Sequence, residues 1–341
     1  MSELSYIDLP TLQSVDSLPL RATSLAMIDL EKVIAHIATA ARRGRYRGPT
    51  EPYDYLLHKK CLVPLDGEPT PTLAGILCFG HRPQDVLPRA VVDIGHYRSI
   101  ETLSYEVIHL EKDIGGTIFD QLTRVESYLW NNIHHGMTLA KGSLQRIEVH
   151  EYPEAVIREL IVNLLVHRDY TNFQSAARVF LFRNRVEWIS PGGLPEGITI
   201  ENLLSSQATR NPMILSILYE AGYVEAIGQG LATVVAELNR MEMLPPRFED
   251  TGSSFRVTVY GQSLDIVSGT GLFADLSPAQ RKILAIMRTQ GSLSIHDIRA
   301  LLTGRAERSV QRDIKALVTA GLVTTSGSAR SLRYHMKETA L

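Results

Sequence analysis

The stretch that decides the fold of this chain is residues 152–170, which read YPEAVIRELIVNLLVHRDY. Apolar residues recur there at three- and four-residue steps, and this spacing predicts a helix with a buried face. Pro153 suits the first helical position, where a missing N–H costs little. Three polar residues interrupt the apolar surface at i, i+4 and i+8, namely Glu159, Asn163 and His167. Because this spacing stacks side chains on one stripe of a helix, we expect the three to lie in line.

The polar stripe has two interpretations. It is either a solvated edge with internal hydrogen bonds, or one wall of a ligand site. A helix that is apolar on nearly every side rarely carries a carboxylate and an amide unless other groups meet them. This argument favours a ligand site.

The same residues carry a resemblance to a known family. Glu-x-x-x-Asn on a buried helix resembles the first motif of the GHKL ATPases, the superfamily of gyrase, Hsp90, histidine kinases and MutL. From about Leu73 to Gly261, the chain is similar to the predicted transcriptional regulators that are related to the RecG helicase by name. Four ordered motifs carry this similarity: residues 153–170 quoted above, ISPGGLP at 189–195, RNP at 210–212 and E-x-x-G-x-G at 225–230.

The resemblance implies an α+β fold in which a two-layer GHKL-like α/β sandwich spans residues 71–261 and places the Glu-x-x-x-Asn helix at 154–168. It also implies ATP as a ligand, with Mg²⁺ held on the phosphates by Asn163. In hydrolysing members Glu159 would polarise the attacking water as general base. We predict one cavity that Glu159 and Asn163 share with Gly192 and Gly228. Nucleotide contacts are expected from Asn163, His167, Gly192, Gly193, Arg210, Asn211, Gly228 and Gly230.

Two features bear on the expected nucleotide chemistry. Ser190 stands where hydrolysing GHKL enzymes usually carry an Asp that reads the adenine amino group, so we expect slow hydrolysis or none. Gly228-Gln229-Gly230 opens an expected helix at 232–241 and resembles the Gly-rich phosphate motif. Backbone amides at a helix start favour anions, although a Gly-x-Gly can also be a simple turn.

Composition predicts a cytoplasmic protein of two or three domains with ordinary cores, because 44% of its 341 residues are hydrophobic. No apolar run approaches the ~18 residues of a membrane span, and the N-terminus lacks a signal segment. Cys61 and Cys78 cannot make a disulfide framework. No carboxylate or Cys stands at a ligand spacing near His134-His135, so we expect no metal site made of protein side chains alone.

The net charge of −2 hides a division of the chain. Residues 266–341 carry eleven Lys and Arg against five Asp and Glu, which gives +6, and the remainder is 24 − 32 = −8. A basic tail on an acidic body suggests that the tail meets a polyanion. A Ser- and Gly-rich stretch at 262–274 is the expected linker.

The tail at 275–336 is predicted to be a winged helix-turn-helix domain. Three helices are expected to start near residues 278, 295 and 305. The third would turn inward Val310, Ile314, Leu317 and Val318. A hairpin is expected to follow at 322–335. The third helix would enter the major groove of double-stranded DNA, and a homodimer would bind two half-sites. The alternative is a winged helix that contacts only protein. The expected DNA contacts are Arg308, Ser309, Gln311, Arg312 and Lys315 on the helix, with Arg330 and Arg333 on the wing.

The N-terminal part, residues 1–70, is expected to be helical or irregular, with a helix at 29–43 that turns Leu30, Val33, Ile34 and Ile37 inward. The AlbA domain that often precedes the family pattern does not fit into so few residues. The apolar runs at 73–80 and 90–97 predict buried strands, and a long helix is expected at 114–133.

The favoured function is a DNA-binding transcriptional regulator whose GHKL-like core senses a nucleotide. One alternative is a Mg²⁺-dependent ATPase that acts on or with DNA. The other is a scaffold with a degenerate nucleotide pocket. Turnover separates the ATPase from the regulator, and saturable nucleotide binding excludes the scaffold.

Overall fold

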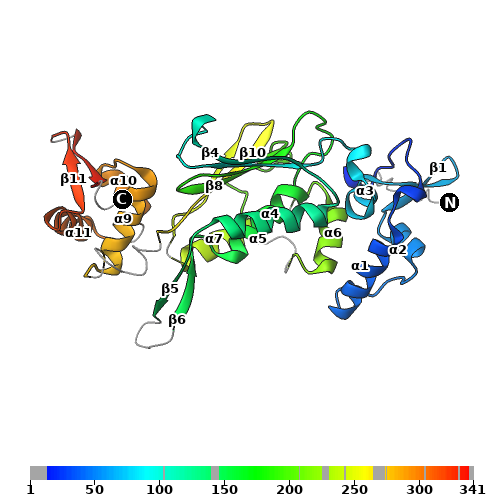
Figure 1. Cartoon of the computed structure of the whole chain (residues 1–341), viewed down its shortest axis with the longest axis horizontal. Coiled ribbons are helices and arrows are strands. Elements are labelled where there is room, and N and C mark those ends of the chain that lie inside the picture. The colour runs from blue at the N-terminus through cyan, green and yellow to red at the C-terminus, as the bar shows by residue number, and fades with distance from the viewer. Residues whose placement is uncertain are drawn as a thin grey trace, which may run out of the picture.

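The chain extends along one axis, with an N-terminal helical part at one end and a C-terminal helical unit at the other (Figure 1). A mixed sheet with helices beneath it lies between them. The computed structural model describes residues 14–102, 104–139, 146–206, 208–224, 230–241, 243–263, 273, 275–302, 305–328 and 331–337.

The central sheet has six strands in the order β4-β3-β7-β8-β10-β9. β3 and β7 run parallel, and the other neighbouring pairs are antiparallel. The strand predicted at 90–97 is confirmed as β3. The bounds are β3 (Val92–Tyr97), β4 (Val107–Ile114), β7 (Ala177–Leu181), β8 (Arg185–Pro191), β9 (Arg247–Asp250) and β10 (Ser254–Tyr260).

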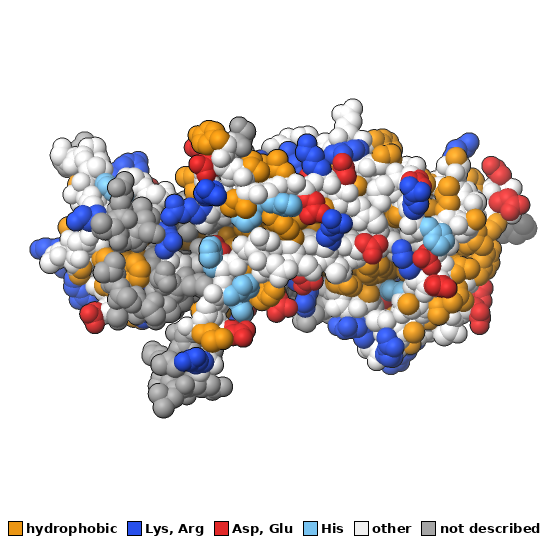
Figure 2. Space-filling view, in the orientation of Figure 1, with side chains coloured by type: hydrophobic (Ala, Val, Ile, Leu, Met, Phe, Trp, Pro, Cys, Tyr) orange, Lys and Arg blue, Asp and Glu red, His pale blue; other side chains and the backbone are white. Residues whose placement is uncertain are grey.

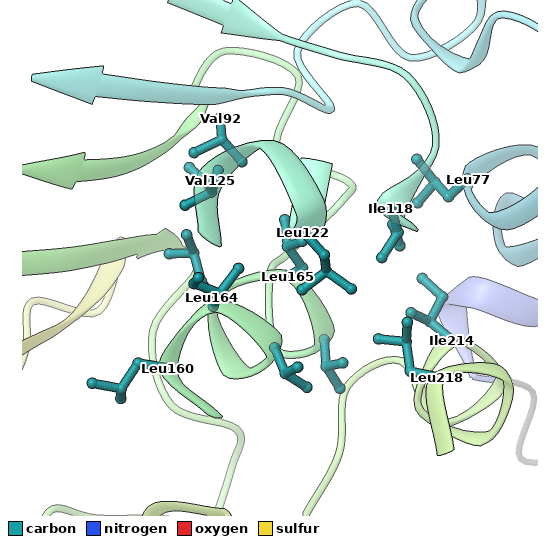
Figure 3. Packing of buried hydrophobic residues seen from close by; sticks show 14 of the residues in the cluster. Leu77, Val92, Ile118, Leu122, Val125, Leu160, Leu164, Leu165, Ile214 and Leu218 are labelled. Carbon is teal, nitrogen blue, oxygen red and sulfur yellow. The ribbon is translucent and has the colours of Figure 1, made fainter. Parts of the chain in front are cut away.

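Three helices, α4 (Ile118–Asn132), α5 (Glu154–Val166) and α7 (Gly230–Arg240), lie under one face of the sheet (Figure 1). The helix predicted from the apolar periodicity is confirmed as α5, although it ends at Val166 and Pro153 is its N-cap. Eight of its apolar residues are buried, because α4, α6, α7 and the sheet surround it. Leu164 and Leu165 pack toward Leu122 and Val125 of α4 in Figure 3. Full burial of such a side chain contributes about 1.5–3 kcal/mol.

The N-terminal part shares one hydrophobic core with the sheet and its helices. It joins the core through α6 (Pro212–Ala221), whose Glu220 is 2% exposed. Lys59 forms an ion pair with this carboxylate, and Tyr55 donates a 2.9 Å hydrogen bond to it. Besides the short 3₁₀ turns, the elements are α1 (Leu30–Arg42), α2 (Pro52–His58), β1 (Leu62–Leu65), β2 (Glu68–Pro71) and α3 (Leu73–Phe79).

Two sequence expectations for this part are wrong. The run at 73–80 forms the helix α3 and not a strand. The prediction failed because a short apolar run that is buried on every side has no periodicity that distinguishes a helix from a strand. The Thr72 side chain accepts a hydrogen bond from the amide of Gly75 and caps the helix. In α1, Leu30 and Ile34 are 43% and 54% exposed, since the helix buries the line that includes Val33 and Ile37.

The C-terminal unit has its own core, made by three helices and a two-stranded antiparallel sheet. In α11 the residues Val310, Ile314 and Leu317 are buried as expected, but Val318 lies at the edge of that face and is 37% exposed. The elements are α9 (Pro278–Gln290), α10 (Ile295–Leu301), α11 (Glu307–Thr319), β11 (Val323–Ser326) and β12 (Arg333–Met336). Most of the expected linker, and Arg330 on the wing, lie outside the described residues.

A hairpin of β5 (His135–Leu139) and β6 (Arg146–His150) extends away from the central body (Figure 1). At its base the ring nitrogens Nδ1 of His135 and His150 lie 2.8 Å apart, and both rings pack against Trp130.

No helix among the described residues has the length and apolar character needed to span a bilayer.

Candidate functional site

A cavity of about 390 Å³ lies between α5, α6, α7 and the sheet. Its volume falls within the range of about 300–1,000 Å³ that small-molecule sites occupy. Helix α5 supplies one wall, β8 and β10 supply the floor, and the segment 192–209 closes another side. The N-terminal parts of α6 and α7 complete the enclosure.

The polar stripe of α5 faces this cavity, because Glu159, Asn163 and His167 all line it. The Asn163 amide nitrogen donates 2.8 Å hydrogen bonds to the Glu159 carboxylate and to the Glu159 backbone carbonyl. The two bonds fix the orientation of the amide group. They use its N–H donors and leave the capacity of its oxygen as an acceptor.

Helix α7 starts directly beside this pair. A Cβ atom added at Gly230 would lie 2.3 Å from Glu159 Oε1 and 3.1 Å from Asn163 Nδ2. Only a residue without a side chain therefore allows α7 to begin here with the carboxylate undisturbed. The close approach of two segments far apart in the sequence sets the polar end of the cavity.

The floor of the cavity is largely apolar and includes Trp188, Phe255 and Val257. Ser190 is the polar exception, and its hydroxyl donates a 3.0 Å hydrogen bond to the backbone carbonyl of Leu164. The hydroxyl oxygen can still accept a hydrogen bond from a ligand. An apolar floor with one neutral acceptor suits a flat heterocycle that carries an amino group.

The turn after β8 is held by tight packing at Gly192, which also lines the cavity. Its φ is +94°, and an added Cβ would lie 2.4 Å from Arg210 Nη1 and 2.6 Å from Asp169 Cβ. Arg210 donates a 2.8 Å hydrogen bond to the Gly193 carbonyl and pairs with Asp169 at 3.2 Å. These contacts hold the glycine turn against the cavity.

The predicted site residues thus fall into three groups. Glu159, Asn163, His167, Gly192, Gly193 and Gly230 line one cavity. Arg210 and Asn211 do not line it but support its walls: the buried Asn211 donates to the carbonyls of Val166 and Arg168 at the end of α5. Gly228 lies outside the described residues.

The apolar lining was not predicted from the sequence. Trp188 and Phe255 look like ordinary core residues in their strands, while Ile198 and Leu203 belong to an irregular segment with no period. Ser216 of α6 was also missed, and it accepts a 2.9 Å hydrogen bond from Lys59 behind the cavity wall. No local pattern marks such residues, because tertiary packing alone turns them toward the cavity.

The charges in the cavity restrict what can bind. Burial, and then the neighbouring Arg210 charge, lower the pKa of His167 to about 4, so its imidazole is neutral near pH 7. No Lys or Arg lines the described part of the cavity, which carries the Glu159 carboxylate. A triphosphate would therefore meet no side-chain cation here and would need a divalent ion to offset its charge.

The described residues contain no cluster of three or more His, Cys, Asp or Glu that could hold a metal ion alone. A cation at this site would thus depend on ligand oxygens as well as on Asn163. This donor set fits Mg²⁺, which keeps waters and substrate phosphates in its coordination shell.

Comparison with known proteins adds two findings. Residues 175–259 match the family described as "Putative ATP-dependent DNA helicase recG C-terminal", which supports a RecG-related, GHKL-like ATPase domain. The matched stretch contains β7, β8 and β10 and begins after α5, so Glu159 and Asn163 lie outside it. None of the curated proteins compared with the sequence matches it.

The fold is similar to the crystal structure of the DIP2311 protein from Corynebacterium diphtheriae, with a TM-score of 0.56 and 20% sequence identity. The similarity covers 96% of this chain and 65% of that chain. At this level of identity the likeness concerns the fold alone. It agrees with a mixed α/β architecture.

Proposed function

We propose that this chain is a DNA-binding regulator whose central domain binds a Mg²⁺-nucleotide. The observation that carries the proposal is the Glu159–Asn163 pair, which faces the start of α7 above an apolar floor. The adjoining match to the RecG-related ATPase domain supports the same ligand class.

In this proposal each end of the cavity meets one part of the nucleotide. The Asn163 oxygen is the ligand for Mg²⁺ on the phosphates, and bound Mg²⁺ supplies the positive charge that the lining lacks. Ser190 accepts a hydrogen bond from the amino group of the base. A neutral hydroxyl is a weaker acceptor than a carboxylate, so base selectivity should be modest.

The link from α7 to the C-terminal unit supports a sensor. Helix α7 starts at the Glu159–Asn163 pair, and the chain then reaches Met243 in the central core and Leu244 against the C-terminal core. A ligand that moves the start of α7 would therefore act on a segment that joins the two cores. Such a segment can bias the C-terminal unit between orientations.

We assign DNA binding to α11 of the C-terminal unit, which would be the recognition helix of a winged helix-turn-helix domain. Arg308, Gln311, Arg312 and Lys315 are exposed on it, and Ser309 is partly buried beside them. Arg333 at the start of β12 is exposed and donates to the Ser292 carbonyl. Base-edge contacts from α11 and phosphate contacts from Arg333 would give sequence preference and salt dependence.

The nucleotide part is tested by calorimetric titration of the full chain with a non-hydrolysable ATP analogue, with and without Mg²⁺. Asn163→Ala should weaken Mg²⁺-dependent binding at least tenfold, while Asn132→Ala on α4 should not, because Asn132 lies outside the cavity. If Asn163→Ala binds as tightly as wild type, the proposed site is wrong.

Catalytic turnover is the alternative that the Glu159 carboxylate keeps open. If the chain hydrolyses ATP, Glu159→Ala should abolish phosphate release and leave nucleotide binding intact, since it removes the base and spares the metal ligand. Robust turnover by this variant would place the base elsewhere.

The DNA part is tested on the full chain by selecting preferred duplex sequences for wild type and variants. Gln311→Ala or Arg312→Ala should change the preferred sequence, because α11 would face base edges. Arg333→Ala should weaken binding to all sequences alike. An operator with two half-sites should bind the chain as a homodimer, and unchanged preference in both helix variants would refute the assignment.

A further inference from the structure

A second and larger cavity, of about 900 Å³, lies between the end of the sheet and α9. We call it the basic groove and define it by Arg98 after β3, Arg183 in the β7–β8 turn, and Arg288 of α9. It shares no lining residue with the nucleotide cavity. A ligand bound in it would therefore be separate from a ligand beside Glu159 and Asn163.

Two of the arginines lie on segments that the fold joins. The backbone amide of Arg183 donates to the carbonyl of Ser99, which joins the β7–β8 turn to the segment that carries Arg98. Both arginines are exposed, and neither forms an ion pair within the described part of the chain. Arginines that line one groove without forming an ion pair create a positive potential that favours an anionic partner.

The rest of the lining does not cancel this charge. Glu151 is the carboxylate among the described lining residues, and it already accepts hydrogen bonds from the backbone and ring of His134. Arg288 on the opposite side donates a 2.6 Å hydrogen bond to Ser263. Figure 2 shows Lys, Arg and His side chains gathered where the central body meets the C-terminal unit.

Exposed apolar side chains also line the groove, and their contact with water is unfavourable. Ile100, Ile108 and Met137 line it and are 54%, 50% and 63% exposed. A partner that alternates anionic groups with less polar surface would fit both kinds of side chain. The sugar–phosphate backbone of a nucleic acid has this alternation, whereas a free small anion does not.

The groove is continuous with the C-terminal unit. Asn184, next to Arg183, donates a 3.1 Å hydrogen bond to the carbonyl of Thr289 at the end of α9. One side of the groove thus belongs to the unit that we assign to DNA binding. A DNA strand that is already bound to that unit would reach the groove intramolecularly, without a second encounter from solution.

We propose that the basic groove binds the sugar–phosphate backbone of DNA, as a second contact beside the C-terminal unit. The inference rests on the proposed function only for the presence of DNA at that unit. The strand could come from a duplex that continues past α11 or from a single strand. Both present the same phosphodiester chemistry.

The test compares the full-length double variant Arg98→Ala/Arg183→Ala with wild type, using a duplex and a single strand of equal length. Dissociation constants are measured at several salt concentrations. Removing two phosphate contacts should lower the slope of log affinity against log salt by about 1.8 for duplex, or about 1.4 for a single strand. The control, Arg21→Ala/Arg47→Ala, removes two exposed charges from the N-terminal part and should keep the wild-type slope.

The outcomes separate this inference from the proposed function. A wild-type slope in the groove variant, with reduced binding in Arg308→Ala/Arg312→Ala, would overturn the groove and keep the C-terminal assignment. The reverse pattern would support the groove and overturn the C-terminal assignment. An equal loss in the Arg21/Arg47 control would also overturn the groove, because it would show only a net-charge effect. Arg98→Gln/Arg183→Gln keeps most of each side-chain stem and repeats the test should the alanine variant melt early.

Discussion

The close approach of Gly230 to Glu159 in the cavity beside α5 gives a specific prediction for Gly230→Ala. The added Cβ would lie 2.3 Å from Glu159 Oε1, whereas ordinary contact begins near 3.4 Å. The carboxylate must therefore retreat by about 1 Å, and a 2.8 Å hydrogen bond from Asn163 would lengthen past the ~3.5 Å limit. The backbone of α7 need not move, because the obstructing atom ends a flexible side chain.

The expected effect on stability is small. Losing one hydrogen bond to a charged group costs about 1.5 kcal/mol at a half-buried site. Gly230 is the first residue of α7, so replacing it by Ala returns less than the about 0.5–1 kcal/mol of a helix interior. Net unfolding free energy should thus fall by about 1 kcal/mol. Affinity for Mg²⁺-nucleotide should fall about tenfold, about 1.4 kcal/mol, because the displaced Glu159 carboxylate, unlike an alanine at this position, would crowd and repel the phosphates beside Asn163.

A double-mutant cycle isolates this contact. In a Glu159→Ala background the obstructing carboxylate is gone, so Gly230→Ala should change nucleotide affinity by less than twofold. The coupling between the two positions should be about 1 kcal/mol, measured by calorimetry with thermal unfolding as the fold control. If Gly230→Ala weakens binding equally in both backgrounds, the carboxylate is not the element it disturbs and the reasoning fails.

Three further changes test other parts of the structure. Gly192→Ala should cost about 2–3 kcal/mol in chemical denaturation, from its positive φ and its crowding, whereas Gly197→Ala, with φ +81° and no atom within 4 Å, should show only the backbone part. His167 has a folded pKa of about 4, below its ordinary 6.5 because of burial and Arg210, so the unfolded chain binds more protons between these values. Stability should therefore fall as pH drops from about 6.5 to about 4 and then level off, and His167→Gln should remove up to about 3 kcal/mol of that loss in pH-dependent unfolding. Lys59→Met should cost about 3 kcal/mol in denaturant unfolding, because it removes the lysine cation from the buried Glu220 carboxylate and leaves it with its contacts to Tyr55 and His36.

Local sequence predicted the helices whose polar and apolar residues repeat over several turns. The periodicity of 152–170 predicts α5, and the line Val310, Ile314 and Leu317 predicts the buried face of α11. Such patterns work because a helix must turn a repeating set of apolar side chains inward. The sequence also predicted that Glu159 and Asn163 share one stripe, since that relation depends only on the helical repeat.

Tertiary structure decided everything that depends on residues far apart in the chain. The run at 73–79 is buried on all sides, so its sequence carries no period, and its environment makes it the helix α3. Gly230 and Glu159 meet although they are 71 positions apart (230 − 159), and no spacing rule predicts this contact. The Arg210 guanidinium is a typical group for binding an anionic ligand. In the fold it contacts Asp169 and the Gly193 carbonyl instead, outside the cavity lining. The sequence alone determines which face of a helix is polar, whereas the fold determines what that face meets, because contacts across the chain depend on packing and not on local repeat.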